Sequence, residues 1–298
     1  MIRTLHEPYL LPAVFANNTI SVEPVTTSGA RLRYYTDSGG DDWMYLSTAA
    51  SLRLVDGRDR RGERRTSIQM PPFRDDAWIP SPNADGSIML NPTSDELDDA
   101  GPQGPAAGLL GQSWFSRYPW EIDYSAESFL LHPELPAGDR GVAVPLGIAE
   151  SGGERLNNFA RIRATVSGEP LDLLLDTGAQ TELTPDAVAR IGGSGSIHAT
   201  SFVISSIVAR WRSEQPDWPV VEKGEAGSGA TMIQVPSLQV GGLTTGPVWF
   251  TQRADRNFLD YMSQWTDRTV VGALGGNALC SFRLLLDIPF GRLFLRPI

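Results

Sequence analysis

The sequence predicts an all-β protein made of two related lobes, each with β-sheets and a few short helices. Three observations indicate this fold class: apolar or alternating runs of strand length, closely spaced Gly, Pro and Asp turns, and three blocks that occur twice in the same order. The chain has 298 residues, of which 41% are hydrophobic and 20% are charged, so it can bury a sizeable core.

The first repeated block ends in an Asp-Ser/Thr-Gly triplet. Residues 28–40 align without a gap on residues 167–179, and this alignment sets Asp37-Ser38-Gly39 opposite Asp176-Thr177-Gly178. At average residue usage such a triplet arises by chance about once in two thousand positions. Two copies at matching points of a repeat therefore favour a shared function, although an Asp before Gly often does no more than cap a turn.

Short helices are expected at two places in each lobe. Residues 46–50 resemble residues 183–187 shortly after each triplet, and Ser47 or Thr184 could cap a helix there. A second short helix is expected after each Leu-Gly pair. The expected helices lie near residues 47–52, 112–117, 185–191 and 276–282.

The second and third blocks extend the repeat. Residues 68–71 match residues 233–236, and residues 77–79 then face residues 248–250. In the third block, residues 109–111 align on residues 273–275, and the alignment runs without a gap from there to Pro133 and Pro297. The second half also has a stretch around residues 197–219 with no apparent counterpart in the first.

The linker between the lobes is expected at residues 134–139, where Pro and Gly interrupt the repeat. The predicted domains are therefore an N-terminal lobe of residues 1–138 and a C-terminal lobe of residues 139–298.

Two aspartates that lie close together can activate water for peptide hydrolysis. One carboxylate draws a proton from the water while the other, protonated, donates to the carbonyl oxygen of the substrate. Because like charges repel, such a pair titrates with two coupled pKa values that belong to the pair. Gly39 and Gly178 permit tight turns beside the carboxylates, and the hydroxyls of Ser38 and Thr177 can bind backbone across the lobe junction.

The sequence resembles the pepsin and retropepsin superfamily of aspartic peptidases. The resemblance rests on the apolar strand and loop of residues 173–179, on Leu274-Gly275, and on the closing strand of residues 284–287. It implies a two-lobed acid-protease fold of duplicated retropepsin-like lobes. It also implies an endopeptidase with Asp37 and Asp176 as catalytic pair, Ser38 and Thr177 as locking hydroxyls, a peptide or protein as substrate, a monomeric state and no cofactor.

The first lobe departs from the family pattern. Its strand carries Arg33 and Thr36 where the second has Asp172 and Leu175, and Gly40 replaces a residue with a side chain. Two alternatives therefore stay open: a retropepsin-like homodimer that uses only Asp176, and a non-catalytic peptide-binding protein with the same fold.

The pH optimum is expected away from strong acid. Neither Gly40 nor Ala179 offers a hydroxyl beside the pair, and by family analogy the loss of hydrogen bonds to the ionised form raises its pKa.

Two hairpins are expected to reach over the cleft as substrate flaps. In the first lobe, residues 57–65 hold five arginines and include Arg60, Arg61 and Gly62; in the second, residues 225–230 include Gly227, Ser228 and Gly229. The arginines suggest a preference for acidic substrates or a pairing with the chain's own residues 95–99. A solvated hairpin that protects a sheet edge is the alternative.

Composition excludes several other functions. The net charge of -10 argues against binding of nucleic acid or anionic membranes, and no apolar run is long enough to span a membrane. The three histidines are scattered, so no metal site is expected. The single cysteine and the lack of a signal-peptide pattern favour the cytoplasm, with a removed targeting segment as the alternative.

Overall fold

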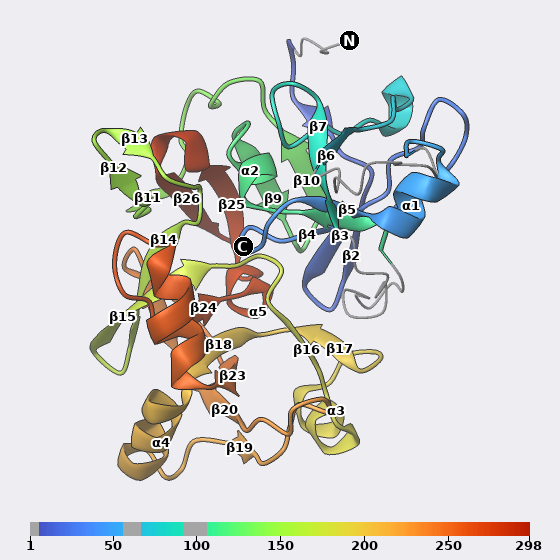
Figure 1. Cartoon of the computed structure of the whole chain (residues 1–298). Helices are drawn as coiled ribbons and strands as arrows, with labels where there is room; N and C mark the ends of the chain where they lie inside the picture. The colour runs from blue at the N-terminus through green and yellow to red at the C-terminus, as the bar shows by residue number, and fades with distance from the viewer. Residues whose placement is uncertain (1–5, 56–66, 92–105) are drawn as a thin grey trace.

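Two β-rich lobes lie next to each other in the computed structural model, which describes residues 6–55, 67–91 and 106–298 (Figure 1). The N-terminal lobe is built around a sheet with the strand order β2-β3-β4-β8-β5-β7-β6. Its strands are β2 (Ala13–Ala16), β3 (Thr19–Val22), β4 (Tyr34–Thr36), β5 (Trp43–Tyr45), β6 (Ser67–Gln69), β7 (Ser87–Asn91) and β8 (Gly108–Leu110).

The C-terminal lobe contains a larger sheet with the order β19-β20-β23-β18-β24-β15-β14-β21-β22. Its strands are β14 (Arg161–Val166), β15 (Glu169–Leu175), β18 (Ser201–Ile204), β19 (Val220–Val221), β20 (Met232–Val235), β21 (Leu238–Val240), β22 (Leu243–Thr245), β23 (Val248–Arg253) and β24 (Gly272–Leu274).

A third sheet, here called the shared sheet, joins the two lobes in the order β1-β10-β9-β25-β26-β11. The strands come from both halves of the chain, and β9 pairs with β25 at the seam. They are β1 (Tyr9–Leu10), β9 (Trp120–Asp123), β10 (Ser128–Leu131), β11 (Val142–Pro145), β25 (Phe282–Asp287) and β26 (Arg292–Pro297). Two further sheets have two strands each. One pairs β12 (Glu150–Ser151) with β13 (Glu154–Arg155), and the other pairs β16 (Gln180–Glu182) with β17 (Ile197–Ala199).

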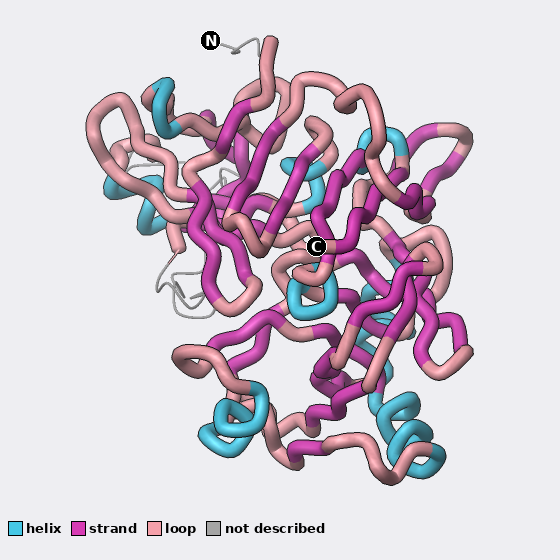
Figure 2. Tube along the Cα trace, turned by 180° about the vertical axis from the view of Figure 1, so that it is seen from behind, coloured by secondary structure: helices cyan, strands magenta, loops and turns pink. Residues whose placement is uncertain are grey.

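The helices are short. They are α1 (Leu46–Ser51), α2 (Gln112–Phe115), α3 (Pro185–Ile191), α4 (Ser205–Glu214) and α5 (Gly276–Leu279), with a π-helical turn at Asn257–Tyr261 and 3-10 turns at Asp75–Ala77, Met262–Gln264 and Ile288–Phe290. Figure 2 shows strands filling both lobes, and Figure 1 places α3 and α4 at the outer end of the C-terminal lobe. The expected caps are wrong, because neither the hydroxyl of Ser47 nor that of Thr184 bonds a helix terminus.

The two large sheets share one topology. The order β6-β7-β5-β8-β4-β3 corresponds to β20-β23-β18-β24-β15-β14, with the same alternation of parallel and antiparallel pairs. In the shared sheet, Phe129 faces Ile122 as Leu293 faces Leu286, which is the register that the third sequence block predicts. The all-β, two-lobed fold class with duplicated lobes is confirmed.

Two of the correspondences predicted from the sequence repeat are wrong. The helix that follows β5 is α1, and the helix in the matching place after β18 is α4, so residues 183–187 are not the counterpart of 46–50. Likewise β7, not residues 77–79, corresponds to β23. Short apolar motifs recur by chance in a β-rich chain, and only the strand partners separate chance matches from true ones.

The true insertion in the C-terminal lobe is residues 180–199, which form β16, α3 and β17. It reaches the N-terminal lobe at the β2–β3 turn. The side-chain amide of Asn17 donates to the carbonyls of Ser194 and Ile197 at 2.5 and 2.9 Å. The backbone carbonyl of Asn17 accepts from the amide of Ala199 at 3.0 Å. These contacts, here called the Asn17 clamp, connect the lobes independently of the shared sheet. The lobe boundary at residues 138 and 139 stays a prediction.

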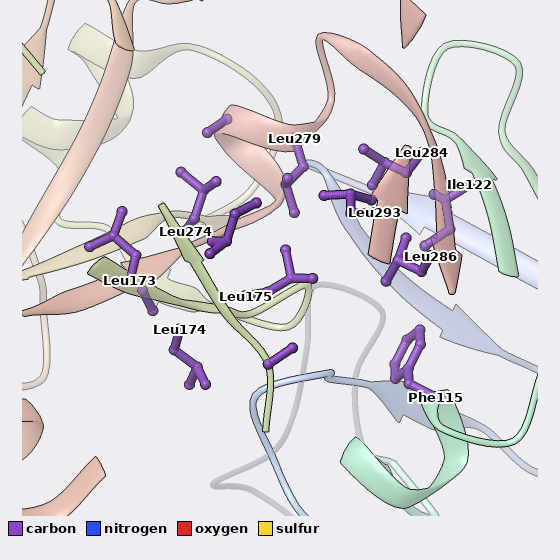
Figure 3. Packing of buried hydrophobic residues seen from close by; sticks show 14 of the residues in the cluster. Phe115, Ile122, Leu173, Leu174, Leu175, Leu274, Leu279, Leu284, Leu286 and Leu293 are labelled. Carbon is purple, nitrogen blue, oxygen red and sulfur yellow. The ribbon is translucent and has the colours of Figure 1, made fainter. Parts of the chain in front are cut away.

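One hydrophobic core runs through both lobes. Leu173, Leu175 and Leu274, beneath the second triplet, belong to the same buried cluster as Phe115 and the shared-sheet residues around Leu286 (Figure 3). The lobes therefore meet through packed side chains as well as through β9 and β25.

Replacing Leu286 with alanine should lower the free energy of unfolding by about 2–5 kcal/mol, because the fully buried side chain leaves a cavity in the shared sheet. Urea denaturation measures the change. The matched control is Leu156→Ala, whose side chain is 65% exposed. An equal, small effect in both variants would contradict this packing.

Candidate active site

Each Asp triplet begins where an inner strand of its sheet ends. Strand β4 runs parallel to β8, and the amide of Asp37 donates to the carbonyl of Leu110 at 2.9 Å. Strand β15 runs parallel to β24, and the amide of Asp176 donates to the carbonyl of Leu274 at 3.1 Å. Both aspartates therefore leave their sheets at equivalent points.

The residues that follow the aspartates bond each other reciprocally. The amide of Ser38 donates to the hydroxyl oxygen of Thr177 at 3.1 Å, and the amide of Thr177 donates to the hydroxyl oxygen of Ser38 at 3.0 Å. The Ser38 hydroxyl also donates to the carbonyl of Leu175 at 2.8 Å, and the Tyr35 hydroxyl donates to the carbonyl of Gly178 at the same distance. All of these bonds are buried and join one lobe to the other.

The two glycines face the aspartate of the opposite lobe. A Cβ atom at Gly39 would lie 2.7 Å from Cγ of Asp176, and one at Gly178 would lie 2.5 Å from Cγ of Asp37. Neither position has room for a side chain, so the close approach of the two loops requires glycine at both. The structure thus brings together all six predicted loop residues.

The environment of the pair favours a shared proton. Asp176 is 9% exposed, and burial raises its pKa well above the ordinary value, as do the charge of Asp37 and a hydrogen bond with its carboxyl group. Backbone hydrogen bonds from Gly178 and Ala179 lower the pKa but do not outweigh these causes. One carboxyl oxygen of Asp176, Oδ1, is buried without a partner among the described residues, which makes the ionised form still less favourable.

The unusual residues of the first loop have structural roles. A Cβ at Gly40 would lie 2.8 Å from Oδ2 of Asp37, so a side chain there would displace the carboxylate of Asp37. The buried hydroxyl of Thr36 donates to the carbonyl of Ile20 at 2.9 Å. Arg33, just before β4, forms an ion pair with Glu23, just after β3, at 2.7 Å.

Asp42 is a residue of the site region that the sequence did not identify. Its carboxylate accepts from the amides of Gly111, Ser113 and Trp114 at 2.7–3.2 Å, which fixes the start of α2 beside the first loop. Burial raises the pKa of Asp42 to about 6 in spite of these bonds. Ser201, the first residue of β18, holds the matching position, and its hydroxyl oxygen accepts from the amide of Gly275 at 3.1 Å. Because Asp42 lies far from α2 in the sequence, no local pattern predicts that it binds the start of this helix.

A cavity of about 720 Å³ opens beside the pair. Its lining includes Gly39 and Asp176 from the two loops, Leu174 and Phe202, Arg253 and residues of the segment 256–264. The sequence did not identify this wall either, because β18 and β23 become neighbours only in the folded sheet.

Of the predicted flap residues, those of the C-terminal lobe lie in the described part of the chain and those of the N-terminal lobe do not. Gly227, Ser228 and Gly229 line a neighbouring cavity of about 840 Å³ in the C-terminal lobe. Arg60, Arg61 and Gly62 lie outside the described residues, as do residues 95–99, and their roles stay predictions.

In the described ranges 6–55, 67–91 and 106–298, no three His, Cys, Asp or Glu residues are grouped so that they could hold a metal ion. No helix in those same ranges has the length and apolar character needed to cross a membrane.

No protein-family model and no curated protein matches the chain. Among solved structures, the chain is similar to the aspartic proteinase from Irpex lacteus, with 11% identity over 97% of each chain and a TM-score of 0.48. At this distance the likeness says nothing about the activity of the chain. The roles of the site residues are therefore argued from the geometry described above.

Replacing Ser38 with alanine should lower the free energy of unfolding by about 2 kcal/mol or more, because the amide of Thr177 and the carbonyl of Leu175 lose buried partners. Urea denaturation measures this loss. Thr177→Ser, which keeps the hydroxyl, is the control and should cost about 1 kcal/mol or less. Equal losses in the two variants would show that the hydroxyl bonds do not hold the loops.

Asp176→Asn should be more stable than the wild type at neutral pH but not at pH 3. Asp176 binds its proton more tightly in the folded chain, so wild-type stability is lost as pH rises from about 4 through the raised pKa. The melting temperature at pH 7 should rise by about 2 °C or more. Asp217→Asn, at an exposed site, is the control. A stability difference that does not change with pH would contradict a raised pKa.

Proposed function

We propose that the chain is an aspartic endopeptidase that hydrolyses peptide bonds with a water molecule activated by Asp37 and Asp176. The observation that carries the proposal is the contact of the Asp37 and Asp176 carboxyl groups at the lobe junction. Asp176 is buried there, and reciprocal bonds between Ser38 and Thr177 hold the two loops together.

In this mechanism the pair holds one proton between its two carboxyl groups. The ionised carboxylate takes a proton from water as the water attacks the carbonyl carbon, and the protonated carboxyl donates to the carbonyl oxygen. The resulting tetrahedral species then breaks down as the leaving nitrogen is protonated. Because the pair titrates as a unit, neither Asp37 nor Asp176 is assigned permanently as acid or base.

An extended peptide suits the cavity beside the pair. The cavity is lined by Gly39 and Asp176 and by apolar side chains such as Leu174 and Phe202, which could receive a side chain of the substrate next to the cleaved bond. Backbone pairing of the peptide to the edges of the cleft would hold it extended.

The contact of Asp37 with Asp176 within one chain favours this mechanism over a homodimer that uses only Asp176. It requires no second copy to supply the other carboxylate. A non-catalytic peptide-binding protein would have no evident need for two carboxyl groups that repel each other.

Asp37→Asn and Asp176→Asn should each reduce kcat by about a thousandfold or more, because each removes one of the two proton-transfer groups. Cleavage of a peptide library at several protein concentrations measures this. Loss of activity in Asp176→Asn alone, with a rate that depends on concentration, would support the homodimer. A wild type that binds library peptides but cleaves none between pH 3 and 8 would support the binding protein.

The activity should fall as pH rises through the raised pKa of the pair and should fall again in strong acid, when both carboxyls are protonated. Since the raised pKa lies above the ordinary aspartate value, the descending limb of the profile should have its midpoint above about pH 4. The measurement is the pH profile of kcat/KM. A descending limb with its midpoint below about pH 4 would contradict the raised pKa.

A further inference from the structure

The cavity beside the aspartate pair and its neighbour in the C-terminal lobe share three lining residues: Arg253, Arg256 and Asn257. The lining of the first cavity includes Asp176, and that of the second includes the loop of residues 227–231. Together they border a path, here called the C-lobe groove, that an extended peptide could follow away from the aspartate pair. Arg253 belongs to both parts of it.

Arg253 is held rigidly at this junction. Its guanidinium stacks on the ring of Phe202 at 4.1 Å from the ring centroid, and both terminal nitrogens donate to the carboxylate of Glu225 at 2.8 and 2.7 Å. One of those nitrogens also donates to the carbonyl of Gln252 at 3.2 Å. Such a two-point pair with a stacked ring fixes the orientation of the planar group.

Glu225 is a buried counter-ion for this arginine. Its side chain accepts from the hydroxyls of Thr181, at 2.8 Å, and Ser228 as well as from Arg253. Burial would raise the pKa of Glu225, but the hydrogen bonds and charge of Arg253 and the two hydroxyls outweigh it and lower the pKa. The carboxylate is therefore charged at neutral pH, and it cancels the charge of the arginine.

The ion pair of Arg253 and Glu225 has no net charge, but Arg253 keeps N–H groups that can donate to a ligand. A guanidinium has five N–H groups, and among the described residues three of those of Arg253 have acceptors. The other charged residues that line the first cavity beyond the aspartate pair are Arg256 and Asp260, which are exposed and of opposite sign. The exposed Glu182 lines the second cavity. Arg253 itself therefore presents no uncompensated charge to an acidic side chain. Arg256 also lines both cavities, but it is exposed, so its charge is screened by water and salt.

We propose that Arg253 is a substrate-binding residue that donates its remaining N–H groups to a backbone carbonyl of the peptide, while Glu225 suppresses selection by charge. The groove accordingly takes neutral, extended peptide segments. This inference rests on the proposed endopeptidase function. It assigns the pair Glu225 and Arg253 a role in substrate recognition in addition to its structural contacts.

The test is a set of peptides that differ only by Glu or Gln at each position on either side of the cleaved bond. The wild type should show no position at which Glu is preferred. In Glu225→Gln the arginine keeps a hydrogen-bond acceptor but loses its counter-ion. At one position, kcat/KM for the Glu peptide should then rise about fivefold relative to the Gln peptide, chiefly through KM. An unchanged preference at every position would overturn the inference.

A second variant tests the inference even if Glu225→Gln does not fold. The double variant Glu225→Gln/Arg253→Met leaves no buried charge unpaired, and the methionine still covers Phe202. It should raise KM about tenfold for every peptide without a preference for Glu, because the donor to the substrate is gone. Unchanged KM values would overturn the inference even if Glu225→Gln failed to fold.

Glu169→Gln is the control for the change in net charge, because it removes the same charge from an exposed ion pair with Arg210 outside both cavities. It should leave the peptide preference unchanged. A wild type that cleaves no peptide would overturn the proposed function and this inference with it. Wild-type cleavage with the same specificity in all variants would overturn only the role of Arg253.

Discussion

The reciprocal hydrogen bonds between Ser38 and Thr177 hold together two groups that would otherwise repel each other. Asp37 and Asp176 approach closely enough for the charge of Asp37 to raise the pKa of Asp176, and the Asp176 side chain is largely removed from water. In such a setting repulsion between two ionised carboxylates is strong, so only a rigid frame keeps them in contact. The buried bonds supply that frame at the backbone, immediately next to the carboxyl groups.

Sequence alone could predict the parts of the site that local repetition encodes. Each triplet follows an apolar strand, and each strand pairs in parallel with a segment ending in Leu-Gly, so the two copies have the same register. The wall made by Phe202 and Arg253 could not be predicted. Those residues lie on strands far apart in the sequence, and nothing near either one shows that β18 and β23 are neighbours. For the same reason residues 183–187 resemble 46–50 although α4 is the true counterpart of α1.

The two lobes keep the same interactions with different residues. At one matching position Arg33 pairs with Glu23 in the first lobe, whereas Asp172 pairs with Arg161 and Arg163 in the second, so the signs are exchanged. A carboxylate at Asp42 and a hydroxyl at Ser201 likewise bind the start of the following helical turn. Aligning the two lobes by residue type misses these equivalent positions. The lobes share an ion pair at one position and a hydrogen bond to a backbone amide at the other, but the side chains that form them differ.

The Asn17 clamp limits how the molecule can move. The lobes are tied by the shared sheet and, separately, by the bonds of Asn17 to the insertion after the second triplet. A hinge motion that spread the lobes would have to break at least one of these ties, and it would also pull apart the loops that carry the aspartates. The spacing of the two carboxyl groups is therefore preserved, and under the proposed function a long, chain-like ligand would have to enter past the segments that border the cavities, such as residues 254–264.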